Sequence, residues 1–452
     1  MGSAQSSETA FYIPENPGYT IVDSAADSIR FTVERTLAPC SCGHVASLSS
    51  FVNPEGAIME WHDFGLLEGP GWAANTVGGA HEVYRMGGIL GKPAWRRIAL
   101  DVLDHALEHG FIDFETGFIR GYRETSTNSH CLNFQHNSEW FCPGSMALIG
   151  LQLLQFAETL GDDMRVGRMR ESAIRCAAWI ERNLEPAPNG WFPRRCAPNG
   201  SLHIARRAEA EDPLWQTSGD GLFIVQLQTA LTQRGLVDYR AAIKNKIDVF
   251  VRSGGIFGSV NHDTYDAHES VAYALGFRTL LAAAALLRDE GVRQFAFDIC
   301  LAGLDRFKLR ADRNGVRTTG LLIMEDSWDT AYLWENAEAS LALFEAANAV
   351  RGASSGLARQ YELAGLTILR ACARYHFGPY GFLTEGVDWN NHVGQQHHID
   401  GATYGAIQYT EPFLNSQHIA EPTLYYVEHL ARRTGDGFRD CEDNLVLRRP
   451  VA

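Results

Sequence analysis

The 452-residue sequence lacks a positive net charge and a Pro/Ser/Gly-rich linker, and we expect no apolar run long enough for a membrane span. The formal net charge of −15 argues against nucleic acid or an anionic membrane as a partner, because both bind basic faces. No apolar run was expected to reach the roughly 18 residues that a membrane span needs. Residues 1–8 also lack the apolar stretch of a secretory leader. We therefore expect a cytoplasmic protein, although a leader removed ahead of residue 1 is left open.

Recognisable cofactor and metal motifs are also scarce. Neither the phosphate-binding pattern G-x-x-x-x-G-K-[ST] nor the nucleophile pattern G-x-S-x-G occurs. The nine cysteines are scattered, and the close pair Cys40 and Cys42 is a weak metal signal by itself, so we expect reduced thiols. We expect no cofactor and no metal. The alternative metal set of His392, His397, His398 and Asp400 fits no standard zinc spacing.

Helical periodicity of apolar residues, in contrast, recurs along the whole chain. Strand signals are limited to short pieces bounded by glycine, such as 117–122 and 190–193, which predict small hairpins at most. Twelve segments carry the helical pattern: 22–38, 75–90, 94–108, 144–161, 165–183, 218–235, 238–253, 267–289, 291–308, 327–350, 353–375 and 416–434.

The connections between these segments alternate in length. A connection of only a few residues follows each even segment. In one of these connections, Gly235 is suited to end the preceding helix. Each odd segment leads to the next by roughly 13–40 residues, far above the usual helix-to-helix connection. Antiparallel hairpins stacked side by side place alternate connections at the same end. All the long connections should therefore meet on one rim.

Composition divides the segments into two classes. Even segments such as 269–287 and 337–347 are apolar on all sides, which is typical of buried helices, whereas odd segments such as 165–182 have a charged face. Six inner and six outer helices predict an all-α (α/α)6 toroid barrel, with residues 1–452 as one domain. An open helical solenoid is the alternative, but it needs sequence repeats that this chain does not show.

The long connections are rich in aromatic and planar polar side chains. Aromatic rings stack on the C–H faces of sugars, while carboxylates, amides and histidines bond to the hydroxyl groups. We therefore expect a carbohydrate pocket and a small carbohydrate as the partner. The alternative is that these aromatic residues only fix the loops to the barrel. The candidate substrate-binding residues are Trp61, His62, Trp72, Arg120, Arg123, Asn137, Trp140, Trp215, Tyr265, Trp328, Trp389, Asn391, His392, Gln396, His397 and His398.

Carboxylates and histidines near the starts of the inner helices are the candidates for acid–base chemistry. The competing interpretation is helix capping, in which His268 with Glu269, or Asp326 with Ser327, satisfies the first-turn amides. The candidate catalytic residues are Asp63, His136, Glu139, Asp220, His268, Glu269, Glu325 and Asp326.

In its architecture the chain resembles the carbohydrate-active (α/α)6 barrels. These include unsaturated glucuronyl hydrolases, β-glucuronidase-type barrels, N-acylglucosamine and cellobiose 2-epimerases, and toroid polysaccharide lyases. The resemblance implies an acidic residue at an inner-helix start in a hydrolase, for which Asp220, Glu269 and Glu325 or Asp326 are similar in position. For an epimerase it implies paired histidines, and His268 and His398 are similar to these.

The leading hypothesis is a β-glucuronidase-like glycoside hydrolase. Arg120, Arg123, Arg206 and Arg207 would clamp a uronate, because guanidinium groups bind planar carboxylates in a bidentate manner. Two carboxyl groups would flank the glycosidic bond.

Three alternatives remain open. The first is a lyase in which His136 or Tyr265 removes a proton and Asn137 neutralises the carboxylate. The second is a sugar epimerase or isomerase. The third is a non-catalytic sugar-binding protein. A homo-oligomer whose partner chain shares the rim is also compatible with the sequence.

Overall fold

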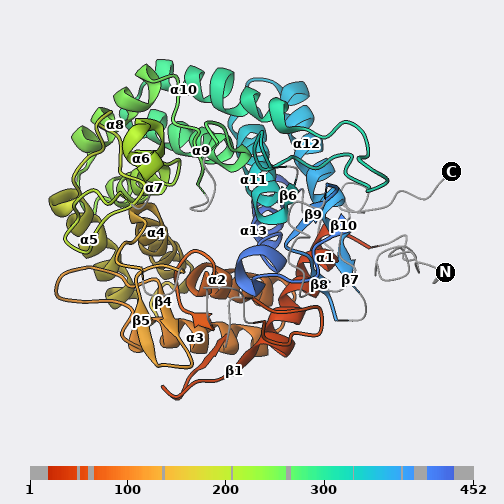
Figure 1. The fold of residues 1–452 in the computed structure, drawn as a ribbon. Coiled ribbons are helices and arrows are strands. Elements are labelled where there is room, and N and C mark those ends of the chain that lie inside the picture. Colours follow the sequence, from red (N-terminus) through yellow and green to blue (C-terminus); the bar gives the residue numbers. More distant parts are fainter. Residues whose placement is uncertain are drawn as a thin grey trace.

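The computed structural model describes residues 19–47, 51–59, 66–134, 138–204, 207–260, 266–328, 330–377, 380–390 and 405–431. Helices in this part of the chain form two concentric rings, which is the predicted (α/α)6 barrel (Figure 1). The inner ring consists of α2 (Thr76–Ile89), α4 (Pro143–Leu160), α7 (Gly221–Gln233), α9 (Ser270–Leu287), α11 (Leu333–Val350) and α13 (Ala420–Tyr425), which continues as η7 (Tyr426–Leu430).

The outer ring alternates with the inner ring along the chain, as the sequence predicts. It consists of α1 (Ile21–Phe31) with η2 (Thr32–Thr36), α3 (Pro93–Glu108), α5 (Val166–Asn183), α8 (Arg240–Arg252), α10 (Glu290–Phe295) with η4 (Ala296–Leu301), and α12 (Ser355–Ala373). Four short helical turns lie in the connections: α6 (Arg207–Glu211), η3 (Pro213–Gln216), η5 (Leu304–Phe307) and η6 (Pro412–Ser416).

Burial explains why the two rings differ in composition. On the outer helix α3 the buried positions Trp95, Ala99, Val102 and Ala106 recur at helical spacing, so one stripe faces the inner ring. On the inner helix α11 nearly every side chain is buried, because neighbours pack on all sides. Each fully buried leucine or valine contributes about 1.5–3 kcal/mol relative to exposure, and the inner ring is the main source of this stabilisation.

One inner helix departs from the expectation that no segment is apolar enough to cross a membrane. Helix α9, Ser270–Leu287, is long and apolar enough by length and composition. Most of that stretch is buried against other helices of the barrel. Its apolar character is therefore accounted for by its place in the inner ring.

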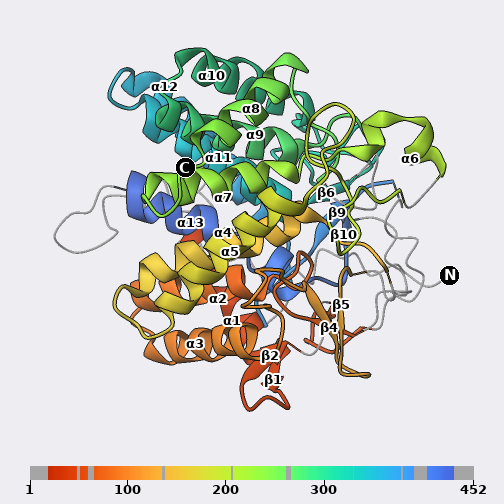
Figure 2. The ribbon, with the colours of Figure 1, turned by 90° about the vertical axis from the view of Figure 1, so that its left-hand side faces the viewer.

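Tight turns and long connections lie at opposite ends of the barrel. The turns after α4 and α7 use Gly161 and Gly235, whose φ angles of 67° and 66° are readily adopted by glycine. Strands β4, β5, β6, β9 and β10 lie on the other face, together with α6 (Figure 2). The predicted gathering of long connections on one rim is thus confirmed for the described residues.

Small antiparallel sheets join the long connections to one another. Strands β3, β4 and β5 form one sheet from the first and second connections, and β6, β9 and β10 form another from the fifth and sixth. Residues 327–332 were predicted to be helical, but β6 occupies 330–332 and α11 begins at Leu333. The strands are β1 (Leu37–Pro39), β2 (Val45–Ser47), β3 (Leu67–Glu68), β4 (Tyr122–Glu124), β5 (Ser129–Cys131), β6 (Thr330–Tyr332), β7 (His376–Phe377), β8 (Phe382–Leu383), β9 (Gly386–Asp388) and β10 (Gly405–Ala406).

Candidate active site

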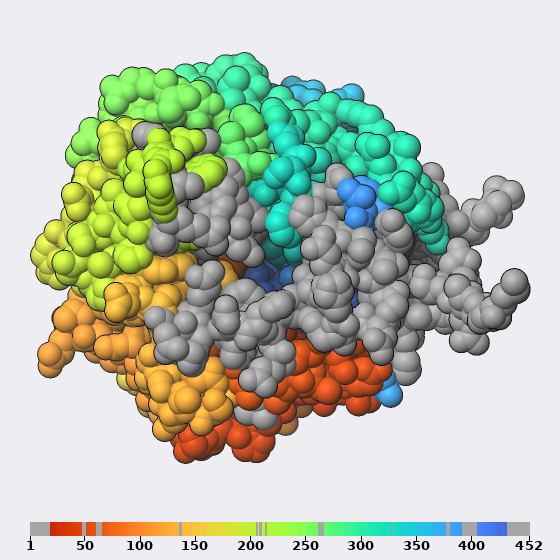
Figure 3. Space-filling model, viewed as in Figure 1, coloured from red at the N-terminus to blue at the C-terminus, as the bar shows by residue number. Residues whose placement is uncertain are grey.

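An aromatic cluster lies where the first connection enters the barrel. The ring of Trp72, just ahead of α2, lies 4.8 Å from that of Trp334 on α11 and 5.7 Å from that of Phe223 on α7. These contacts reach two different inner helices, α7 and α11, so Trp72 joins them from the segment ahead of α2. Trp72 is only 7% exposed. Its indole ring is therefore packed in the interior. The space-filling view shows a recess near the centre of the ring of helices (Figure 3).

Asp220 immediately precedes the inner helix α7 and is almost completely buried. Its carboxyl group lies against the first turn of α4, because a Cβ atom on Gly144 would stand 2.5 Å from Oδ2 of Asp220. Neither carboxyl oxygen has a hydrogen-bond partner among the described residues. Burial raises the pKa of Asp220 to about 7, although Ser218 and Arg194 nearby lower it in part. Asp220 can therefore hold a proton at neutral pH.

Two adjacent arginines that were not among the predicted site residues lie on the connection that leads to Asp220. Arg194 and Arg195 are both buried on the third connection, and the charge of Arg194 acts on the carboxyl group of Asp220. The guanidinium carbon of Arg195 lies 4.4 Å from the ring centre of Trp140, a predicted sugar-binding residue. The signal in the sequence was the pair itself, two adjacent arginines within the apolar stretch of residues 191–196.

Glu269 and Glu325 lie together near the starts of α9 and α11. Both are buried, and their backbones form an antiparallel bridge. The carboxylate of Glu269 accepts a hydrogen bond from the amide of Val260, and that of Glu325 accepts one from the hydroxyl of Ser259 at 3.2 Å. The two carboxylates are thus held by adjacent residues of the fourth connection, Glu269 by Val260 and Glu325 by Ser259.

Hydrogen bonds connect this carboxylate pair with Asp220. The amide of Asp220 donates to the hydroxyl of Ser218 at 3.2 Å, and that hydroxyl donates to the carbonyl of Ser259 at 2.5 Å. Ser259 in turn binds Glu325. The structure therefore brings three predicted catalytic residues into one connected region beside the starts of α7 and α9.

The other predicted catalytic residues that the structure describes lie in more open positions. His268 is half-buried and its Nδ1 lies 2.7 Å from the hydroxyl of Tyr273. Asp326 is exposed and paired with Arg306, and Glu139 is exposed as well. The predicted capping role of His268, Glu269 and Asp326 is not realised, since α9 has no side-chain cap and α11 begins at Leu333.

The predicted arginines and tryptophans are spread over several environments. Arg123 is buried and bonded to Glu68, while Arg207 is exposed and paired with Glu211 on α6. The remaining ones comprise half-buried Arg120, Trp215 and Trp328, and buried Trp389. Predicted residues that lie outside the described part of the chain are Trp61, His62, Asp63, His136, Asn137, Arg206, Tyr265, Asn391, His392, Gln396, His397, His398 and Asp400.

A network of charged side chains links four inner helices further inside the barrel. His418, just before α13, contacts Glu82 on α2 at 3.0 Å and Glu338 on α11 at 2.9 Å, and Glu338 also pairs with Arg278 on α9. Its two carboxylate partners raise the pKa of His418 to about 10 against the opposing effect of burial. We call these four residues the inner ion network. Sequence reasoning missed it, although Glu338 and Arg278 are conspicuous charges in apolar helices.

Comparison with known proteins identifies the fold. No protein-family model and no curated protein sequence matches the chain. Among solved structures, cellobiose 2-epimerase from Bacillus thermoamylovorans has a TM-score of 0.61 at 12% identity, covering 90% of this chain and 99% of that one. A D-mannose isomerase gives 0.56 at 10% identity, covering 90% and 96%. A family 76 glycoside hydrolase from a bovine Bacteroides thetaiotaomicron strain gives 0.54 at 10% identity, covering 90% and 77%. The chain shares the (α/α)6 fold of these carbohydrate-active enzymes.

Proposed function

We propose that this protein is a glycoside hydrolase that acts on a sugar carrying a uronic acid, with Asp220 as the proton donor. The observation that carries the proposal is the buried carboxyl group of Asp220, whose pKa is raised to about 7. A glycosidase must protonate the departing oxygen, and a carboxyl group does so at neutral pH only when its pKa is raised. Asp220 stands at an inner-helix start, on the rim where the long connections meet.

The second carboxyl group of a glycosidase is expected from Glu269 or Glu325. Both lie near inner-helix starts adjoining that of Asp220, and Ser259 links Glu325 to the segment that carries Asp220. In this role the carboxylate activates a water molecule or attacks the sugar carbon, according to its distance from the proton donor.

Selection of a uronate is assigned to Arg194 and Arg195. A buried guanidinium group binds a carboxylate more strongly than an exposed one, because water does not compete for it. Arg195 also lies on Trp140, so a charge and an aromatic face adjoin the same part of the rim. Arg123 of the sequence-based clamp bonds to Glu68.

The test compares matched substrates that differ only in the carboxylate. The protein is incubated with 4-nitrophenyl β-glucuronide and 4-nitrophenyl β-glucoside, and with oligosaccharides ending in glucuronic acid. We expect release of a new reducing end, with kcat/KM for the glucuronide at least about tenfold above that for the glucoside. Equal rates on both would contradict the uronate assignment, and no hydrolysis of any glycoside would contradict the reaction class.

A sugar epimerase or isomerase is the second candidate, favoured by one observation. His418 stands at the start of α13, as His268 does at the start of α9, so two histidines lie near inner-helix starts.

Proton NMR of the same incubations separates the reactions. Conversion of a free sugar to its epimer without a new reducing end would favour the epimerase. A new ultraviolet absorbance from an unsaturated uronate would instead indicate a lyase. A bound sugar recovered unchanged would indicate a binding protein.

A further inference from the structure

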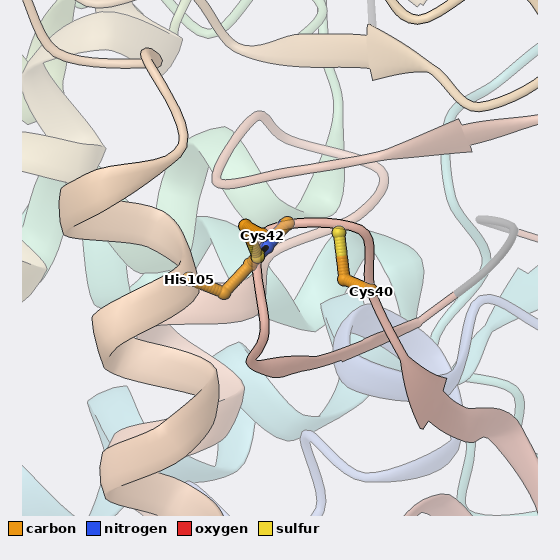
Figure 4. Close-up of side chains that lie close together, drawn as sticks. All are labelled: Cys40, Cys42 and His105. Atoms are coloured by element: carbon orange, nitrogen blue, oxygen red, sulfur yellow. Dashed lines mark hydrogen bonds between the residues drawn. The ribbon is translucent and has the colours of Figure 1, made fainter.

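A cluster of metal-binding side chains lies on the outside of the barrel, away from the rim residues described above. Cys40 and Cys42 lie at the turn between β1 and β2, and His105 faces them from the outer helix α3 (Figure 4). Sγ of Cys42 is 3.2 Å from Nδ1 of His105. Sγ of Cys40 is 3.8 Å from Nε2 of His109, one helical turn further along α3. Two thiols and two imidazoles thus converge from two separate elements.

We propose that Cys40, Cys42, His105 and His109 bind one zinc ion. Zinc favours four ligands of this kind in a tetrahedron, with bonds of about 2.3 Å to sulfur and 2.0–2.1 Å to nitrogen, which places neighbouring sulfur and nitrogen ligands about 3.6 Å apart. The two sulfur–nitrogen distances, 3.2 and 3.8 Å, lie on either side of that value. Ligand atoms of Cys40, Cys42 and His105 all lie within 4.8 Å of one another, and those of Cys40, Glu68 and His109 form a second set within the same limit. Cys40 is shared by the two sets.

The surroundings of His105 have the form expected around a metal ligand. Its Nε2, on the far side of the ring from Cys42, lies 3.5 Å from a carboxylate oxygen of Glu68, and both side chains are fully buried. Metal-binding histidines commonly direct their second nitrogen to a carboxylate, which fixes the tautomer and the ring orientation. Arg123 bonds to the same oxygen of Glu68 and holds it in place. Glu68 is therefore inferred to be a positioning residue for His105.

Two competing uses of these side chains are less consistent with the contacts. His44, also nearby, is already engaged by Asp101 at 2.9 Å and by Glu108 at 3.3 Å, so we do not include it among the ligands. A disulfide between Cys40 and Cys42 would leave the two histidines without a role. The C-x-C spacing is shorter than that of standard zinc motifs, which is why the sequence alone did not reveal the site.

Zinc at this position would stabilise the rim from outside. The hairpin β1–β2 contacts the barrel through α3, and Glu68 belongs to β3, which pairs with β4 of the second connection. Residues 69–71 lead from β3 directly to Trp72 of the aromatic cluster. One ion would thus join an outer helix to two of the long connections. Binding would deprotonate the two thiols, and the protons would pass to solvent.

The experiment measures metal binding rather than catalysis. Full-length protein, purified under reducing conditions, is assayed for zinc by mass spectrometry and then, after chelation, titrated with Co²⁺. We expect about one zinc per chain and the visible absorption bands of tetrahedral cobalt bound to thiolates. The variants Cys40→Ser and Cys42→Ser should each weaken binding at least tenfold, and Glu68→Gln about 10–100-fold. Circular dichroism verifies that each variant is folded.

The matched control is Cys131→Ser, which removes a half-buried thiol on the neighbouring strand β5 outside the cluster. It should retain the metal content of the parent protein. The proposal is overturned if the parent binds neither zinc nor cobalt, if Cys40→Ser and Cys42→Ser bind zinc as the parent does, or if reductant-free protein contains a Cys40–Cys42 disulfide. If one serine variant fails to fold, the other and the cobalt spectrum of the parent still decide the matter.

Discussion

The carboxyl group of Asp220 at the rim and that of Glu338 in the inner ion network are both buried, and their pKa values are shifted in opposite directions. Glu82 of the same network differs from Glu338, because burial raises its pKa. At the rim, burial dominates and raises the pKa of Asp220 to about 7. In the inner ion network, Arg278 and His418 outweigh burial and lower the pKa of Glu338 to about 2. Charge that is balanced by a cation stabilises structure, whereas a carboxyl group that is only partly balanced can exchange a proton at neutral pH. This contrast is the basis for assigning chemistry to the rim.

Replacing Asp220 by a residue that cannot donate a proton to the substrate is the most direct test of this contrast. The variant Asp220→Asn should lower kcat on the glucuronide by about 10²–10⁴-fold, the usual contribution of general acid catalysis. Its folding should be retained, because the neutral amide resembles the protonated acid. Initial rates with saturating substrate measure the effect. The control is Asp238→Asn, which changes an exposed carboxylate just ahead of α8, at the end of the barrel that has the tight turns. This variant should leave kcat unchanged. A loss below about tenfold would remove Asp220 from the mechanism.

The inner ion network should respond in stability. The variant His418→Gln removes the cation between Glu82 and Glu338, and uncompensated buried charge typically costs about 3–5 kcal/mol of unfolding free energy. Urea denaturation at pH 7 measures this loss. The pKa of His418 is raised in the folded state, so its stabilising effect should be complete below pH 6.5 and disappear as the pH rises through about 10. If His418→Gln is as stable as the parent protein but has lost epimerase activity, His418 has a catalytic role instead.

Periodicity and connection lengths were sufficient to predict the barrel, because a helix that is apolar on all sides has to be inside. They also placed Asp220, Glu269 and Glu325 at the rim. Each of these residues lies near the point where a long connection enters an apolar helix. Arg194 and Arg195 could not be assigned in this way. Their burial depends on the bridge between Phe141 and Cys196, a contact between two different connections. Neither segment shows that pairing in its own sequence.

The proximity of the four residues proposed to bind zinc could not be predicted for the same reason. Cys40 and Cys42 lie about sixty residues before His105 and His109, and only the packing of the β1–β2 hairpin on α3 brings them together. Likewise, the inner ion network joins helices from opposite ends of the chain, so the separate charges of Arg278 and His418 gave no indication of a common site.

Arg194 offers a smaller but more specific test of the rim. Its positive charge lowers the pKa of Asp220, so Arg194→Gln should raise that pKa further. The alkaline limb of the kcat/KM profile should move to higher pH, while KM for the glucuronide rises about tenfold and KM for the glucoside changes little. If the role of Arg194 is purely structural, the variant should change the melting temperature and leave the alkaline limb of the kcat/KM profile at the same pH. Equal effects on both substrates would contradict the uronate assignment.

The pH profile of the unmodified protein gives the smallest effect. As a proton donor with a pKa of about 7, Asp220 should cause kcat/KM to fall as the pH rises through neutrality. Stability follows the same sign, because a pKa raised from 3.8 means that the folded state binds the proton more tightly. The parent should therefore lose stability relative to Asp220→Asn between about pH 4 and pH 7, and the difference should level off above that range. If the free energy of unfolding changes with pH in the same way for both proteins across this range, Asp220 is already ionised in the folded protein. The rim would then resemble the inner ion network, and the proton donor would have to be sought elsewhere on it.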